Sequence, residues 1–157
     1  MTKHTVVLGL GNPLMGDEGV GTRIIEMLQT ASGDFPEADL IDAGTGGMSI
    51  LHLIAGRKKA VIVDCALMDA PPGSIRRFTP EEVRTLKQLS HLSLHEVDII
   101  KVIDLARSLG ECPEEIVLFG IEPQTIEQRM GLSGPLSDRL TEYAEAIRQE
   151  LRPAPAP

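Results

Sequence analysis

The chain has 157 residues, of which 42% are hydrophobic and 24% are charged, as in an ordinary globular protein. That composition excludes a disordered chain, a collagen and a coiled-coil rod. Fifteen Lys and Arg residues against 23 Asp and Glu residues give a net charge of −8, which disfavours binding to nucleic-acid phosphates. The chain has no Trp, one Tyr and three Phe, so it offers few aromatic side chains on which bases stack. We expect one domain over residues 1–151 and a flexible Pro-rich tail at 152–157.

Cysteine use and the N-terminus indicate where the protein works. Cys65 and Cys112 are too few for a disulfide framework, which fits a reducing compartment. The apolar run at 5–10 is ended by Gly11, Asn12 and Pro13, so it is too short for a signal peptide or a membrane span. We therefore expect a cytoplasmic protein that binds no membrane, and its size allows a monomer.

Strands and helices alternate in the sequence pattern. Short apolar runs bounded by turn residues are typical of strands buried on both faces of a parallel sheet. Runs with helical spacing lie between them, and a Ser-x-x-Glu capping box at 93–96 predicts the start of a helix that ends at Gly110. This alternation predicts an α/β sandwich around a mainly parallel sheet. The predicted strands are 6–10, 38–42, 59–64, 116–120 and a more polar edge strand at 74–78, and the predicted helices are 17–28, 48–54, one from 80, 93–109 and 136–151.

Acidic residues follow three of the predicted strands. The first strand leads through a Gly-rich loop to Asp17 and Glu18, the second ends at Asp42, and the third ends at Asp64. A fourth group, His95, lies at the predicted start of the helix after residue 90. Ligands of open α/β sheets bind at the carboxyl ends of the strands, where these groups can meet. We therefore predict a metal site there, because carboxylates with one imidazole suit nickel or zinc.

Each of these residues also has a purely structural interpretation. Asp17 can cap a helix, Glu18 can complement a helix dipole, and Asp42 can belong to a turn. Asp64 is harder to explain this way, because an uncompensated charge at the end of a buried strand is costly. His91, in the loop before His95, is a rival imidazole that spacing does not exclude. The pattern is not that of an ordinary zincin, because the His-Glu-x-x-His motif that begins at His95 has isoleucine at its second histidine position.

Other chemistries match the sequence less well. Leu14 stands at the third glycine position of a dinucleotide fingerprint, and Asp17 stands where a P-loop has its lysine, so no organic cofactor is expected. A cysteine nucleophile, Cys65 with His95 as its base, is conceivable. However, Cys65 directly follows a buried strand, where a free cysteine is usually a packing residue.

Several segments together carry a resemblance to a known family. They are GLGNPLMGDEGVG at 9–21, DAGTGG at 42–47, VD at 63–64, SLHE at 93–96, GIEP at 120–123 and GLS at 131–133. In this order, from about residue 5 to residue 150, the chain resembles the hydrogenase maturation endopeptidases, which process nickel-iron hydrogenase large subunits. The first segment is specific. The later segments are weak individually, but their joint order along the chain makes an accidental similarity improbable.

The resemblance implies a fold, an activity and a set of site residues. The implied fold is a three-layer α/β/α sandwich with a twisted, mainly parallel, five-stranded sheet. The implied activity is removal of the C-terminal extension of the large-subunit precursor after nickel insertion. Glu18, Asp64 and His95 correspond to the metal-binding triad of the family, and Asp42 corresponds to a further position linked to activity. The nickel would be carried by the substrate.

Two other classes of function stay open at this point. A nickel-binding maturation chaperone without peptidase activity would use the same ligands. A nucleotide-binding domain would show a thermal shift with NAD or ATP, because a ligand that binds only the folded state stabilises it.

Overall fold

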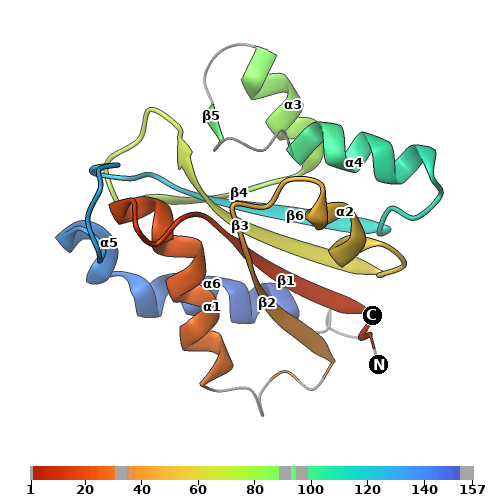
Figure 1. Cartoon of the computed structure of the whole chain (residues 1–157), viewed down its shortest axis with the longest axis horizontal. Coiled ribbons are helices and arrows are strands. Elements are labelled where there is room, and N and C mark those ends of the chain that lie inside the picture. The colour runs from red at the N-terminus through yellow and green to blue at the C-terminus, as the bar shows by residue number, and fades with distance from the viewer. Residues whose placement is uncertain (1, 31–34, 36, 89–92, 95–98, 153–157) are drawn as a thin grey trace.

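The sheet at the centre of the protein is built mostly from the predicted parallel strands. A computed structural model describes residues 2–30, 35, 37–88, 93–94 and 99–152 (Figure 1). Five strands follow the order β2-β1-β3-β6-β4, in which β4 alone is antiparallel to its neighbour and forms an edge, as expected. The strands are β1 (Thr5–Leu10), β2 (Ala38–Gly44), β3 (Lys59–Leu67), β4 (Ile75–Phe78) and β6 (Glu115–Ile121).

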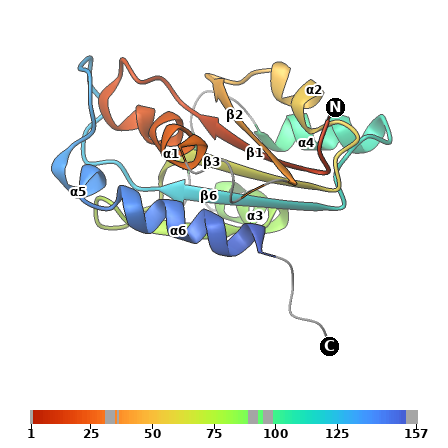
Figure 2. The same cartoon turned by 90° about the horizontal axis from the view of Figure 1, so that it is seen from below.

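Helices cover both faces of this sheet, which confirms the three-layer prediction (Figures 1 and 2). One core cluster joins one face of the sheet to α1 and α6, and the other cluster joins the opposite face to α2, α3 and α4. Side chains alternate between these clusters along β3, with Ile62 in one and Val63 in the other, so the strand is buried on both faces. The helices are α1 (Val20–Gln29), α2 (Ser49–Ile54), α3 (Pro80–Gln88), α4 (Ile99–Ser108), α5 (Gly134–Ser137) and α6 (Leu140–Leu151).

The predicted helix start at Ser93 is wrong. Ser93 and Leu94 form a short strand, β5, that pairs antiparallel with β3 through Leu67 and Ala66. The pattern predicts that β3 ends at Asp64, but the strand continues to Leu67 and offers backbone groups to a further strand. Pairing with that extension overrides the local capping signal. Helix α4 is described from Ile99 onward, and residues 95–98 lie outside the described residues.

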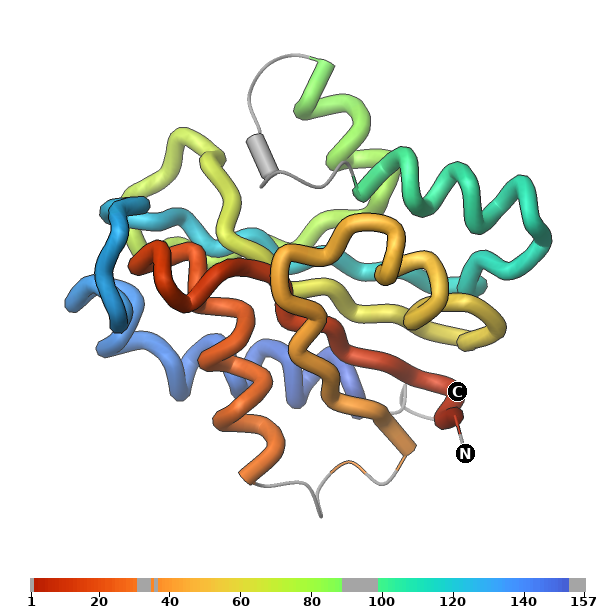
Figure 3. Tube along the Cα trace, viewed as in Figure 1, coloured from red at the N-terminus to blue at the C-terminus, as the bar shows by residue number. Residues whose placement is uncertain are grey.

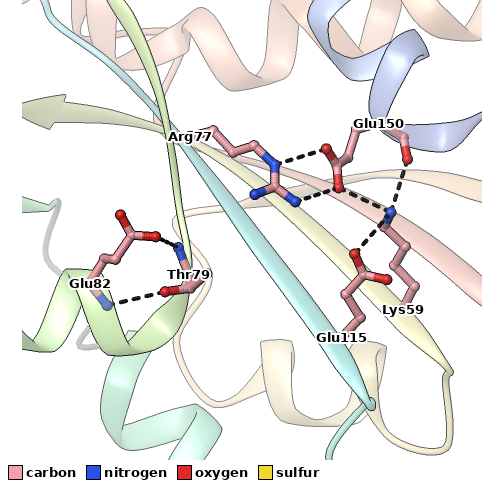
Figure 4. A network of polar contacts seen from close by, with 6 residues as sticks. All are labelled: Lys59, Arg77, Thr79, Glu82, Glu115 and Glu150. Carbon is pink, nitrogen blue, oxygen red and sulfur yellow. Dashed lines mark hydrogen bonds and ion pairs between the residues drawn. The ribbon is translucent and has the colours of Figure 1, made fainter. Parts of the chain in front are cut away.

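A capping box does exist at α3, where the sequence analysis did not place one. The backbone N–H of Thr79 donates to Oε1 of Glu82 at 3.1 Å, and the Glu82 N–H donates to Oγ1 of Thr79 at 3.2 Å (Figure 4). The two bonds satisfy N–H groups that the start of a helix otherwise leaves without partners.

Two glycines allow the start of α1 to lie against the end of β1. A Cβ atom on Gly21 would meet the carbonyl oxygen of Leu10 at 2.3 Å, and one on Gly9 would meet the Gly21 oxygen at 2.4 Å. No side chain fits at either position, so the backbones approach closely. This contact places the 3-10 turn η1 (Gly16–Gly19), which precedes α1, at the carboxyl edge of the sheet.

An ion-pair network ties α6 to the opposite end of the sheet (Figure 4). The Glu150 carboxylate accepts two hydrogen bonds of 2.9 Å from the Arg77 guanidinium and lies 3.0 Å from Lys59 Nζ. Lys59 also lies 3.4 Å from Glu115. The hydrogen bond from Arg77 and the neighbouring Lys59 hold the pKa of Glu150 below its ordinary value. The network therefore favours the charged carboxylate and the docking of α6.

We expect Glu150→Gln to lower the free energy of unfolding by about 1–2 kcal/mol at pH 7, because it removes a bidentate, charge-assisted contact. A lowered pKa in the folded state means that the stabilisation is present above the ordinary glutamate pKa of about 4.3 and is lost as the pH falls further. Urea unfolding of both proteins at pH 7 and at pH 3 measures this difference. Glu142→Gln, at an exposed position of the same helix, is the control. A difference that stays constant down to pH 3 would contradict the assignment.

Within the part of the chain that the structure describes, no helix is both long and apolar enough to cross a lipid bilayer.

Candidate active site at the carboxyl edge of the sheet

The structure places two of the three predicted triad residues in the interior at the same edge of the sheet. Glu18 lies in η1 and Asp64 lies in β3, and each is 7% exposed. The turn η1 contacts β3 directly. The third residue, His95, lies outside the described residues, as does its rival His91. The chain that leads to His95 is described up to Leu94, which pairs with Ala66 of β3, two residues after Asp64.

Several acidic side chains lie close together at this edge, and their charges affect the pKa of the Cys65 thiol. Burial raises the pKa of Cys65 above its ordinary value, and the nearby carboxylates of Asp64 and Glu18 raise it further. A thiol with a raised pKa is protonated and unreactive at neutral pH. The Cys65 side chain packs in the core between the sheet and α1, which favours the packing role over that of a nucleophile. The same charges favour a bound cation.

Asp42 lies at the same edge of the sheet and is exposed. In the sheet, Asp42 of β2 pairs with Gly9 of β1. On the other side of β1, Gly9 pairs with Val63 of β3, which directly precedes Asp64. Strand alternation puts Asp42 on the face of α1, and it puts Asp64 on the opposite face. A substrate would therefore have to cross the edge of the sheet to meet both carboxylates.

One oxygen of the Asp42 carboxylate is held in place from two sides. Its Oδ1 accepts hydrogen bonds from the backbone N–H of Gly44 at 2.9 Å and from Oγ1 of Thr22 at 3.2 Å. The first bond is the turn interaction that the sequence suggested, and Thr22 is a buried residue of α1 that the sequence analysis did not single out. Among the described residues, no hydrogen bond is made to Oδ2, so this oxygen is available for water or substrate.

Asp17 does not cap a helix, contrary to one interpretation of the sequence. It lies inside η1, is fully buried, and the residue at the N-cap position is Met15. Its carboxylate instead binds the segment 124–133, more than a hundred residues away in sequence. Figure 3 shows that this segment, in blue, lies beside the red and orange chain after β1. Burial alone would raise the pKa of Asp17, but the hydrogen bonds that it accepts, first from Ser133, hold that pKa below its ordinary value.

Glu122 is a second buried acid that the sequence analysis did not assign to a role. Its Oε1 accepts hydrogen bonds from the backbone N–H groups of Met68 at 2.8 Å and Ala70 at 2.9 Å. These bonds fix the turn after β3, in which Asp69 has a positive φ of 56°. Glu122 directly follows the strand β6, so the argument that singled out Asp64, a charge at the end of a buried strand, could also have found it.

A pocket of about 280 Å³ opens between η1, α1 and the segment that Asp17 holds. Its walls are mostly apolar, with Pro13 on one side and Met130 and Leu132 on the other, and Arg23 and Glu26 add charge. Gly16 and Gly19, which flank Glu18 in η1, also line the pocket. A bound peptide therefore has a recess next to the turn that carries Glu18.

The carboxylates at this edge are ligands that suit a divalent cation. The described residues alone, however, do not complete a metal site. Among them, no group of three His, Cys, Asp or Glu side chains comes together in a way that could hold a metal ion. Of the buried acids at this edge, Asp17, Glu122 and Asp64 accept backbone hydrogen bonds, Asp64 from the Cys65 N–H at 2.8 Å, and Glu18 and Asp64 are the acids of the predicted triad. An additional ligand from outside the described residues, or from a substrate, is needed to hold a metal.

Comparison with known sequences gives a consistent result. A family model described as hydrogenase maturation protease matches residues 22–150. The hydrogenase 2 maturation protease of Escherichia coli K12 is 30% identical over 148 residues, which cover 94% of this chain and 90% of the relative. The hydrogenase expression/formation protein HoxM of Cupriavidus necator is 31% identical over 149 residues, which cover 92% of this chain and 74% of the relative.

Solved structures show the same fold. The hydrogenase maturating endopeptidase HybD from Escherichia coli matches with a TM-score of 0.80 and 27% identity, over 95% of this chain and 92% of that one. The maturation protease HybD from Thermococcus kodakarensis matches with a TM-score of 0.79 over 95% and 99% of the two chains. At 22% identity, this second match is evidence of fold alone.

Proposed function

The chain belongs to the hydrogenase maturation protease family and is a peptidase, and from that premise we propose that it removes the C-terminal extension of a nickel-iron hydrogenase large-subunit precursor. Cleavage follows nickel insertion and takes place in the cytoplasm. The observation that carries the proposal is the pair of acids, Glu18 and Asp64, buried at the carboxyl edge of the sheet.

Glu18, Asp64 and His95 are the residues that we assign to the recognition of the nickel. The ion belongs to the loaded precursor, so the three side chains complete its coordination and the protein needs no metal of its own. Carboxylate and imidazole ligands suit nickel, and the negative charge around Cys65 favours a cation over an empty site. The triad then serves as a checkpoint, because a precursor without nickel gives these carboxylates nothing to bind.

Hydrolysis requires that a water oxygen bond to the scissile carbonyl carbon and that a proton reach the departing amine. A metal ion near the bond polarises the carbonyl and lowers the pKa of a bound water. We assign Asp42 to the water, as the group that orients it or accepts its proton, since Oδ1 is fixed by Thr22 and Gly44. The pocket lined by Pro13 and Leu132 takes the chain next to the bond.

The purified protein, incubated with nickel-loaded and with nickel-free precursor, tests this function. We expect the loaded precursor to lose its extension and the nickel-free precursor to stay intact, because the triad has no ion to bind in the second case. Electrophoretic mobility and the mass of the released peptide measure the cleavage. Equal cleavage of both forms would contradict the checkpoint. Stable association without cleavage would favour the maturation chaperone instead.

A further inference from the structure

The buried carboxylate of Asp17 is the point at which two distant parts of the chain are joined. Its Oδ2 accepts hydrogen bonds from the backbone N–H groups of Gln124 at 2.8 Å and Thr125 at 3.1 Å, and from Oγ of Ser133 at 2.8 Å. Its Oδ1 accepts a bond of 2.7 Å from the Ser133 N–H. Four donors thus converge on one side chain that has no exposed surface.

Backbone hydrogen bonds run between the same two segments. The N–H of Gly16 donates to the carbonyl of Arg129 at 2.9 Å, and the Arg129 N–H donates to the carbonyl of Leu14 at 3.1 Å. The N–H of Asp17 donates to the Thr125 carbonyl at 3.3 Å. The turn before Glu18 is therefore held by the segment 124–133 on both sides of residue 16.

This arrangement bears directly on Glu18, the next residue along the chain. Among the described residues, no side chain forms a hydrogen bond that caps the short turn η1. A further negative charge beside Glu18 is also unfavourable for a group of buried acids. The hydrogen bonds to Asp17 offset that cost and fix the direction in which η1 presents its next side chain.

We propose that Asp17 is a positioning residue for peptide cleavage, whose carboxylate holds the segment 124–133 against η1 and thereby orients Glu18 toward the edge of the sheet. Asp17 itself touches neither the substrate nor its metal ion. This inference rests on the proposed function, in which Glu18 contacts the nickel of the precursor.

Asp17→Asn tests the proposal, because both carboxylate oxygens face N–H donors. However the amide turns, its NH₂ group faces a donor and at least one bond is lost. We expect kcat for the loaded precursor to fall about 10- to 100-fold while KM changes less than about threefold, since a small misplacement of a contact group slows the reaction step. The assay is run at a temperature at which thermal unfolding shows the variant to be folded. Asp138→Asn, the same change at an exposed position directly after α5, should retain kcat within about threefold.

Hydrogen exchange gives a readout that does not depend on activity. In Asp17→Asn, the amides of Gln124, Thr125 and Ser133 should exchange at least about tenfold faster, while amides in the strand β3 keep their protection. If the wild-type protein cleaves no precursor, the proposed function fails and the exchange data still test the anchor. A folded Asp17→Asn variant with wild-type kcat, or with unchanged exchange at these amides, would overturn the proposal. A loss of kcat no larger than the unfolded fraction of the variant would overturn it as well.

Discussion

Glu18→Gln and Asp64→Asn should each reduce cleavage of the nickel-loaded precursor by about 100-fold or more, as losses of groups at a charged reaction centre do. Each change keeps the shape of the side chain and removes its charge. Both side chains are buried close to other acids. Their charges add to the effect of burial in raising the pKa of Cys65. Thermal unfolding of each variant shows whether it is folded at the temperature of the assay.

Matched variants separate the roles of the site residues. His95→Ala should lose cleavage to the same extent as the two acid variants, because it removes the third member of the triad. Asp42→Asn should still bind the loaded precursor and lose cleavage, since its assigned role concerns the water. Glu114→Gln, at an exposed position before β6 and far from the site, should cleave normally. Binding is measured by co-purification and cleavage by release of the extension. Near-normal cleavage by Glu18→Gln, Asp64→Asn and His95→Ala would remove the triad assignment.

Gly11→Ala should cost at least about 3 kcal/mol of folding free energy and abolish cleavage, through backbone strain and a steric clash. Gly11 has a φ of +132°, which side chains rarely adopt, and a Cβ atom there would lie 1.7 Å from the carbonyl oxygen of Glu18. That contact is to the backbone, so no rotation of a side chain relieves it. The variant forces η1 away from β1, and Glu18 moves with it.

Gly110→Ala is the matched control for this prediction. Gly110 also has a positive φ, of +70°, but nothing lies within 4 Å of a Cβ atom built on it. It should therefore cost only about 1 kcal/mol, from the backbone conformation alone. Thermal and urea unfolding of both variants measure the two costs. Equal costs would show that the contact with Glu18 is accommodated by other movements.

Local patterns in the sequence determined the layers of the fold. Apolar runs such as the one in β3 predict strands buried on both faces, because a parallel sheet is covered by helices on each side. The rule that ligands bind at the carboxyl edge of such a sheet then placed Glu18, Asp42 and Asp64 together at one edge. Both results follow from properties of single elements and their order along the chain.

The tertiary structure decided how these residues are held. Asp17 has the sequence position of a helix cap, yet its carboxylate binds donors 107 to 116 residues away, and no local pattern encodes those partners. The Ser93 pattern likewise predicts a helix start, but backbone groups at the end of β3 recruit this segment as β5. Hydrogen bonds between remote segments depend on where the whole chain has folded. The sequence by itself therefore determined the elements of the fold and the edge of the sheet at which the candidate residues lie, and only the tertiary structure decided which remote segments are joined there.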